Sequence, residues 1–333
     1  MTEQRKVALI GTGGTISAVG RDPFDLIDYD ANGKMLDAAG VLALLPQAPP
    51  NVEIVPVPFR TMSSTGIYFN EWKQLVAQCT ELAEQIPDLA GIVITHGTAS
   101  MEETAYFLHL TLKVRIPVVL VGSQRPSNAL SSDASLNLYN AIRVAAAPNS
   151  WGLGVLVVLN DEIHAARDVT KSSTYRLQTF RSPDVGVLGH CDGDAVAFYR
   201  LPVRLGAPQT EFDVSKLDNL PKVGISYSHT GSDGCVIRAL ADAGHRGIVI
   251  AAFAPGCVAP DELTALGEVV EAGVVVAIST RAGSGRVGDG VVLRENNILS
   301  ADNLNPQKAR LLLALALTQT SEMKELARMF RTY

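Results

Sequence analysis

The stretch that decides the fold spans residues 92–105 and reads Ile-Val-Ile-Thr-His-Gly-Thr-Ala-Ser-Met-Glu-Glu-Thr-Ala. Branched apolar residues at 92–94 predict a buried strand, and Gly97 predicts the turn that ends it. The residues after this turn predict the start of a helix, with Ser100 as its cap and Glu103 completing a capping box. A strand that leads through a tight turn into a helix is the unit from which parallel α/β sheets are built.

The same unit recurs along the first half of the chain. Helical spacing of apolar side chains predicts helices over 72–86 and 136–144, with Asp133 as a cap for the second. Short apolar runs bounded by glycine, proline or asparagine predict strands at 7–10, 52–57, 91–95, 118–121 and 155–159. We therefore predict an α/β fold whose larger N-terminal domain holds a mostly parallel sheet.

A change of composition marks a boundary between two domains. The stretch from Pro202 to Pro221 carries three prolines, mixed charges and weak periodicity, which is typical of an interdomain connection. We predict an N-terminal catalytic domain over 1–201, a linker over 202–222 and a smaller C-terminal α/β domain over 223–333. Within that second domain we expect strands at 223–227, 248–253 and 274–278, and a helix over 309–317 followed by a short tail.

Composition excludes several classes of protein. The 333 residues include 28 Lys and Arg against 34 Asp and Glu, a formal charge of −6, so binding to nucleic acid is not expected. A hydrophobic fraction of 47% with 19% charged residues excludes a disordered chain. Neither a signal-peptide core nor a membrane span is expected from the apolar runs. The cysteines at 79, 191, 235 and 257 form no Cys-x-x-Cys pair and predict reduced thiols of a cytoplasmic protein.

The Gly-rich segment Gly11-Thr12-Gly13-Gly14-Thr15-Ile16 follows the first predicted strand. A dinucleotide site of the Rossmann type is one interpretation, but Ile16 stands where the third glycine belongs. A plain tight turn is a second interpretation. The third is a loop that presents a hydroxyl, from Thr12 or Thr15, to a ligand.

Two further segments carry candidate chemistry. The turn after the strand at 91–95 presents Thr98 at a helix N-terminus, where free N–H groups stabilise an anion, and His96 is expected to be a buried, hydrogen-bonded histidine. The segment Asn160–Lys171 is rich in titratable groups. Asp161, Glu162 and His164 suggest a metal, yet adjacent groups on a loop more often face solvent, and from composition alone Lys171 is a surface lysine.

Together these segments resemble the bacterial-type L-asparaginase/glutaminase family of amidohydrolases over nearly the whole chain. The matching pieces, in the family's order and spacing, are Thr12–Ile16, Thr95–Thr98 with Met101–Leu108, Arg125–Ser127, Asn137–Ala141, Arg167–Lys171 and Leu304–Arg310. The resemblance implies a catalytic N-terminal domain, no cofactor and no metal, and a homo-oligomer that is commonly a tetramer, built as a dimer of dimers. It also implies hydrolysis of a small-molecule carboxamide to the acid and ammonia.

The resemblance assigns roles to individual positions. The family's nucleophilic threonine falls on Thr15, and its activating tyrosine falls on Tyr29, within a lid over 19–34. The second threonine and the lysine fall on Thr98 and Lys171, and the serine that holds the substrate carboxylate falls on Ser64. Backbone N–H groups of the two glycine turns, at Gly14 and at Gly97 with the following threonine, are expected to hold the substrate and the tetrahedral oxyanion.

The chain departs from the family at the contacts to the substrate's α-ammonium. Ala99 stands in place of an aspartate, Thr65 stands in place of a glutamine or aspartate, and Asp289 is only the nearest counterpart of an acid contributed by the neighbouring subunit. Losing one partner of a buried charge costs roughly 3–5 kcal/mol. One of the lid's acids, at positions 22, 25, 28 and 30, is a possible replacement. Without the aspartate we expect the pKa of Lys171 to fall, which either improves it as a base or disables the relay.

Three functions therefore remain open. The first is an asparaginase or glutaminase with a rearranged ammonium contact. The second is an amidase that uses the same machinery on a carboxylate-bearing amide without a free α-amine, such as an N-substituted asparagine or a des-amino analogue. The third is a non-catalytic binding homologue, against which the retention of Thr15, Thr98, Lys171 and Ser64 argues.

Overall fold

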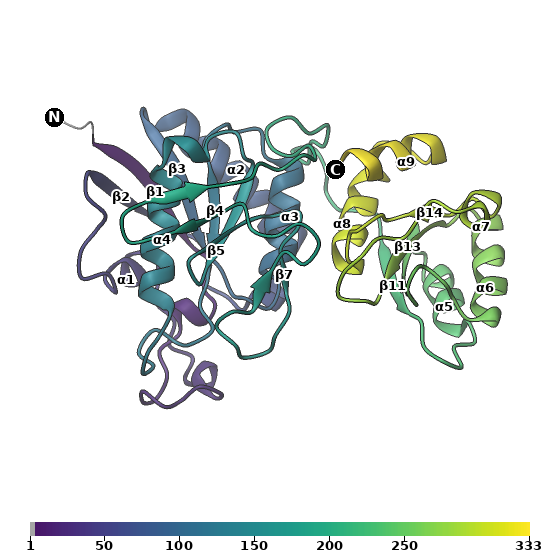
Figure 1. Cartoon of the computed structure of the whole chain (residues 1–333), viewed down its shortest axis with the longest axis horizontal. Coiled ribbons are helices and arrows are strands. Elements are labelled where there is room, and N and C mark those ends of the chain that lie inside the picture. The colour runs from purple at the N-terminus through teal and green to yellow at the C-terminus, as the bar shows by residue number, and fades with distance from the viewer. Residues whose placement is uncertain (1–3) are drawn as a thin grey trace. The chain divides into compact units, whose positions relative to one another are not determined.

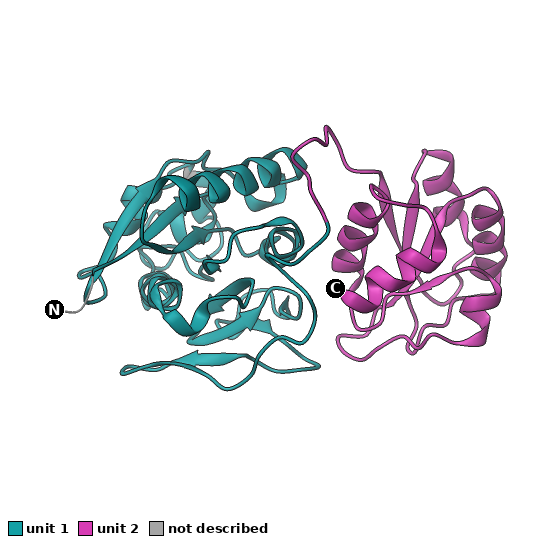
Figure 2. Cartoon of the chain, turned by 90° about the horizontal axis from the view of Figure 1, so that it is seen from above, with its two compact units in different colours: residues 1–211 teal, residues 212–333 magenta. Residues whose placement is uncertain are grey.

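The computed structural model describes residues 4–333. The chain divides into two compact units, and the boundary along the sequence lies between Glu211 and Phe212 (Figure 2). This boundary lies inside the stretch that composition marks as a connection. Each unit is an α/β layer structure with its own sheet, so the predicted fold class is confirmed. None of the described helices combines the length and the apolar character that crossing a bilayer requires.

Unit 1 is built on an eight-stranded sheet with the order β10-β9-β6-β5-β4-β3-β1-β2. Figure 1 labels β1 to β5 of this sheet. Its five parallel strands are the five that the apolar runs predict, and four of them are buried along most of their length. Their bounds are β1 Arg5–Gly11, β2 Val52–Val57, β3 Leu89–Thr95, β4 Val118–Val121 and β5 Val155–Leu159. Because strands buried on both faces need apolar residues at every position, continuous runs identify them well.

Helices cover both faces of this sheet. α1 (Ala38–Leu42) and α4 (Ala134–Ala146) pack with alternate residues of the central strands, such as Val93 and Val119, in one buried cluster. α2 (Phe69–Gln85) and α3 (Met101–Thr111) pack against each other and cover the opposite face. There, Trp72 of α2 stacks on Phe107 of α3 at 4.6 Å between ring centroids, which joins the two helices, and α3 packs against β5.

Both predicted side-chain caps are wrong, and for one physical reason. The Ser100 hydroxyl donates to the Ser64 backbone oxygen at 2.7 Å instead of capping α3. The Asp133 carboxylate accepts from the backbone N–H groups of Gln124 (2.9 Å) and Arg125 (3.0 Å) instead of capping α4. In each case the backbone of another loop competes for the capping group: Ser64 lies 36 positions from Ser100, and Gln124 and Arg125 lie nine and eight positions before Asp133.

Replacing Asp133 by alanine is therefore expected to destabilise unit 1 by about 2 kcal/mol or more, because two partly buried backbone donors lose a charged acceptor. The matched control is Asp37→Ala, which removes a genuine N-cap that accepts only from the Gly40 N–H and should cost about 1 kcal/mol. Urea unfolding measures both. Equal costs for the two variants would show that the Asp133 contacts contribute no more than an ordinary cap.

The sheet's antiparallel extension is absent from the sequence-based prediction. Asn160 and Asp161 both have positive φ, 53° and 63°, and form a two-residue hairpin turn from β5 into β6 (Glu162–Ala165). An Asn-Asp pair between two apolar runs is a hairpin signal of this kind. The other short strands are β7 Thr170–Lys171, β8 Phe180–Arg181, β9 Gly189–Cys191 and β10 Val196–Phe198.

Unit 2 holds a parallel four-stranded sheet in sequential order, with α5 and α6 in one buried cluster of the sheet and α8 packed against three of its strands. All three predicted strands are present. The predicted short tail is instead α9, a helix that packs on α8. The elements are β11 Val223–Tyr227, α5 Cys235–Asp242, β12 Gly247–Ala252, α6 Pro260–Glu271, β13 Val275–Thr280, α7 Val291–Glu295, β14 Leu299–Ser300, α8 Pro306–Ala316 and α9 Met323–Thr332.

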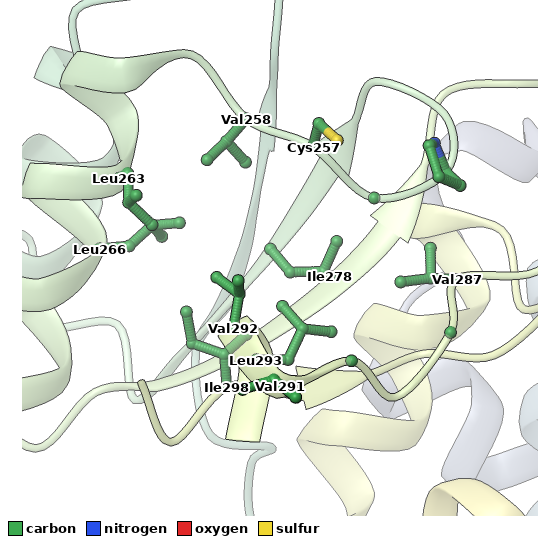
Figure 3. A pocket seen from close by; sticks show the side chains of 14 residues that line it. Cys257, Val258, Leu263, Leu266, Ile278, Val287, Val291, Val292, Leu293 and Ile298 are labelled. Atoms are coloured by element: carbon green, nitrogen blue, oxygen red, sulfur yellow. The ribbon is translucent and has the colours of Figure 1, made fainter. Parts of the chain in front are cut away.

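Unit 2 also contains an apolar pocket of about 340 Å³ (Figure 3). Its walls are formed mainly by branched side chains, among them Leu266, Ile278 and Val292, with the Cys257 thiol at one edge. No predicted catalytic side chain lines it. The chemistry that the sequence predicts therefore belongs to unit 1.

Candidate active site

The candidate site lies where three neighbouring strands of unit 1 end. β1 pairs in parallel with both β2 and β3, so the segments that follow these strands leave the same edge of the sheet. This is the edge at which open α/β sheets bind ligands. The turns after β1 and β3 touch: a Cβ atom at Gly14 would lie 2.2 Å from the Gly97 Cα atom. Only two glycines can meet this closely, and they bring Thr15 and Thr98 to one site.

Thr15 begins a one-turn helix, η1 (Thr15–Ser17), directly after Gly14. Gly14 has a φ of 84°, a conformation that glycine adopts without strain. The hydroxyl of half-buried Thr15 lies 2.9 Å from the phenol oxygen of Tyr29, at the start of η2 (Tyr29–Asn32). The structure thus brings together the two side chains that the resemblance pairs as nucleophile and activator.

The lid that carries Tyr29 is fastened at its base and along one side. Val19 N–H donates to the Lys34 oxygen at 3.1 Å, which closes the loop at its base. Asn128 bonds the backbone of Gly20 in both directions, at 2.7 and 2.8 Å. The loop after β4 therefore holds the lid in the position that places the Tyr29 phenol on Thr15.

Thr98 is bonded to the predicted lysine. Lys171, on β7, donates from Nζ to the Thr98 Oγ1 atom at 2.7 Å. Thr98 is buried, and Lys171 is half-buried rather than the surface residue that composition suggests. A short two-stranded sheet of β7 with β8 carries the lysine to this position.

Burial lowers the pKa of Lys171 below its usual value of 10.5, and the Glu102 carboxylate opposes this shift. The direction agrees with the expectation, although desolvation is the largest cause. Glu102 lies in the first turn of α3 and is itself buried. A lysine whose ammonium form is disfavoured, held against a threonine hydroxyl, is suited to accept a proton.

Ser64 lies at the other side of the glycine contact. It begins η3 (Ser64–Gly66), is buried, and its hydroxyl oxygen would lie 2.7 Å from a Cβ atom at Gly97. Thr65 is exposed, and its hydroxyl bonds Ser63 at 3.0 Å. The structure therefore places Ser64 beside the glycine turns, whereas the described contacts of Thr65 remain local.

The groups near the expected ammonium position differ from the family pattern. Ala99 is exposed and offers no charge. Among the lid's acids, buried Asp25 accepts from Arg21 and from the Asp28 N–H, and Asp22 accepts from the Phe24 N–H. These carboxylates stabilise the lid itself. Asp289 lies in unit 2, near Arg294.

The histidines have structural partners. His96 is buried and bonds the Gly97 oxygen, as expected for a core histidine. His164 is also buried, on β6, and bonds Ser182 at 3.0 Å, so the expectation that it faces solvent is wrong: the hairpin turns it into the sheet. Within residues 4–333, no cluster of three or more His, Cys, Asp or Glu side chains is arranged to hold a metal.

Glu102 and Ser100 take part in the site in ways that the sequence does not predict. Glu102 acts on Lys171, and Ser100 joins the start of α3 to Ser64. The only sequence signal for Glu102 is its position one helical turn beyond Thr98, which places both at the same helix end. Nothing in the sequence points from Ser100 to Ser64, since 36 positions separate them.

Comparisons with known proteins agree on one family. The model described as "Asparaginase, N-terminal" matches residues 6–204, and that described as "Glutaminase/Asparaginase C-terminal domain" matches residues 222–330. The chain is 38% identical to L-asparaginase 2 of Bacillus subtilis, covering 98% of this chain and 86% of that protein. It is 37% identical to a glutaminase-asparaginase of Pseudomonas fluorescens, covering 100% of this chain and 91% of the relative.

Two other relatives are named for different compartments. The chain is 39% identical to a probable periplasmic L-asparaginase of Haemophilus influenzae, over 98% of this chain and 93% of that protein. A crystal structure of a probable cytoplasmic L-asparaginase from Campylobacter jejuni superimposes with a TM-score of 0.90 at 37% identity. That match covers 99% of this chain and all of the other.

Proposed function

Because this chain belongs to the asparaginase family, we propose that it is an amidohydrolase that releases ammonia from the carboxamide of L-asparagine or of a closely related small carboxylate-bearing amide. One observation carries the proposal. Two pairs of side chains are hydrogen-bonded, Thr15 with Tyr29 and Thr98 with Lys171. The two threonines follow the neighbouring strands β1 and β3, and the contact of Gly14 with Gly97 joins their turns.

In the first half of the proposed reaction, the Thr15 hydroxyl attacks the carboxamide carbon. Its proton leaves to the Tyr29 phenol or through Thr98 to neutral Lys171, because a threonine hydroxyl is a weak nucleophile without a base. Backbone N–H groups of the Gly14 and Gly97 turns stabilise the oxyanion. Collapse of the tetrahedral intermediate breaks the C–N bond as the base returns this proton to the leaving nitrogen, which departs as ammonia and leaves an ester on Thr15.

In the second half, water attacks this ester. The same base removes a proton from the water, the C–O bond to Thr15 breaks, and the threonine recovers its proton. Ser64 binds the substrate's carboxylate throughout. The net reaction consumes one amide and one water and yields one acid and ammonia, with no cofactor required.

Ammonia release by the purified protein at neutral pH tests the proposal. We would compare L-asparagine, L-glutamine, succinamate and an N-acyl-asparagine side by side. Turnover of any of these supports an amidohydrolase, and the ranking identifies the substrate class. Absence of ammonia from every amide at high enzyme concentration would contradict catalysis and favour a binding homologue.

The second candidate function is hydrolysis of an amide without a free α-amine, such as an N-substituted asparagine. Ala99 favours it, since the side chain after Thr98 offers no charge to an ammonium group. The engagement of Asp25 and Asp22 within the lid also favours it. If asparagine is nevertheless the preferred substrate, the contact comes from an exposed lid acid, Asp28 or Asp30, or from an acid of a neighbouring subunit.

Ala99→Asp is expected to lower the KM for L-asparagine about 10- to 100-fold, because it restores a carboxylate to a partly desolvated ammonium. Succinamate is the internal control: it lacks the α-amine, so its KM should stay constant or rise. Steady-state kinetics on both substrates measures the effect. An unchanged asparagine KM would mean that another acid already binds the ammonium.

We further propose a homotetramer built as a dimer of dimers and a cytoplasmic location. The oligomer rests on the family resemblance, and light scattering after size-exclusion chromatography tests it. The location is supported by the Campylobacter jejuni neighbour and by four free cysteines, Cys79, Cys191, Cys235 and Cys257, whereas the Haemophilus influenzae relative is named as periplasmic. Fractionation of the source cells decides between the compartments.

A further inference from the structure

We infer that His96 is a positioning residue that fixes the peptide unit carrying the Thr98 N–H, one of the donors to the oxyanion. The inference rests on the proposed function, because it concerns the geometry of that site. His96 directly follows β3, is fully buried, and has no assigned part in the chemistry.

The hydrogen bond between the His96 ring and the Gly97 carbonyl shows which ring nitrogen carries the proton. His96 Nδ1 lies 2.8 Å from the carbonyl oxygen of Gly97. A carbonyl oxygen only accepts, so Nδ1 must carry the hydrogen and the ring is the Nδ1–H tautomer. Burial lowers the pKa of His96 to about 4, so the ring stays neutral across the range in which an amidase works. Among the residues that the structure describes, no partner bonds the buried Nε2 atom.

This bond fixes the orientation of the peptide unit between Gly97 and Thr98. The Gly97 carbonyl and the Thr98 N–H belong to one planar peptide unit. Holding the oxygen therefore sets the direction in which the N–H points. Glycine has the widest choice of backbone angles of any residue, so the chain at Gly97 does not hold this peptide by itself. The His96 ring supplies the missing restraint.

His96 and Gly97 are themselves held in place by neighbouring segments. The His96 N–H donates to the Val121 oxygen at 2.8 Å, which ties the residue to the end of β4. Gly14 packs so closely on Gly97 that a Cβ atom at Gly14 would lie 2.2 Å from the Gly97 Cα atom, at which this peptide unit begins. The peptide is thus confined between the Gly14 turn and a ring anchored in the sheet. The donor is positioned before substrate arrives, as oxyanion stabilisation requires.

The test compares three variants on whichever amide the wild type hydrolyses best. His96→Leu removes the donor and is expected to reduce kcat 10- to 100-fold with KM within twofold, since the bond acts only on the transition state. His96→Asn retains an N–H donor at a similar position and should restore most of kcat. His109→Leu is the matched control: His109 is buried in the same unit, on α3, and bonds the Val155 N–H outside the site.

A merely structural role predicts a different result. His96→Leu and His109→Leu would then lose thermal stability alike and keep kcat, and His96→Asn would give no specific rescue; either outcome overturns the inference. If His96→Leu does not fold, histidine ¹⁵N spectra of the wild type decide: an Nδ1–H tautomer that persists to about pH 5 is expected, and an Nε2–H tautomer refutes the inference. A wild type without ammonia release contradicts the proposed function instead.

Discussion

Thr15→Ala is expected to reduce amide hydrolysis by on the order of 10⁴-fold or more while the fold remains intact. The hydroxyl is the atom that forms the ester, and no other group can replace it at that position. Its removal leaves the glycine turns in place, because η1 begins at Thr15 through backbone bonds and Gly14 supplies the turn. Ammonia release and circular dichroism measure the two expectations.

Two further variants separate the nucleophile from its activator. Thr15→Ser keeps a hydroxyl and should retain measurable turnover. Tyr29→Phe keeps the ring but removes the oxygen that lies 2.9 Å from Thr15, so it should lower kcat less than the loss of the nucleophile does. Full activity of Thr15→Ala would show that the family's nucleophile does not act in this chain, and Thr12 would become the next candidate.

The strands could be predicted because burial on both faces leaves an unambiguous pattern. Every position of β3, from Leu89 to Thr95, is buried, and its apolar residues follow one another without interruption. The strand ends then fix which loops share an edge of the sheet, and the segments with Thr15 and Thr98 each follow a predicted strand, whereas Ser64 is identified only through the family resemblance. Their roles came from the family resemblance, not from the pattern.

The rest depends on contacts that no local pattern contains. Ser100 and Asp133 occupy cap positions in the sequence, yet the Ser100 side chain bonds Ser64, which only the tertiary fold brings near, and the Asp133 side chain bonds the preceding loop at Gln124. Lys171 is surrounded by polar residues in the sequence and is nevertheless half-buried. Its bond to Thr98 joins positions 73 residues apart, and that bond is what makes it a candidate base.

Lys171→Met is expected to lower kcat by about 10²- to 10⁴-fold, because it removes the group that takes a proton from Thr98. Methionine preserves most of the apolar stem, so packing should survive. Lys113→Met is the matched control: Lys113 also bonds a threonine hydroxyl of unit 1, that of Thr210 at 2.8 Å, but lies outside the site. It should leave kcat unchanged.

The pH dependence distinguishes a base from a merely structural lysine. Burial lowers the pKa of Lys171, so the reactive neutral amine is lost as the pH falls through that lowered value. Wild-type kcat should therefore decline on the acidic side, whereas the residual rate of Lys171→Met should lack that decline.

The lowered pKa of Lys171 also makes the stability of the fold depend on pH. Folding disfavours the ammonium form, so this cost is complete below the folded pKa and disappears as the pH rises above 10.5, the unperturbed value. Lys171→Met should thus gain stability relative to the wild type near neutrality and lose that advantage in alkali. An acidic decline that survives in the variant would assign the titration to another group and leave Tyr29 as the base for Thr15.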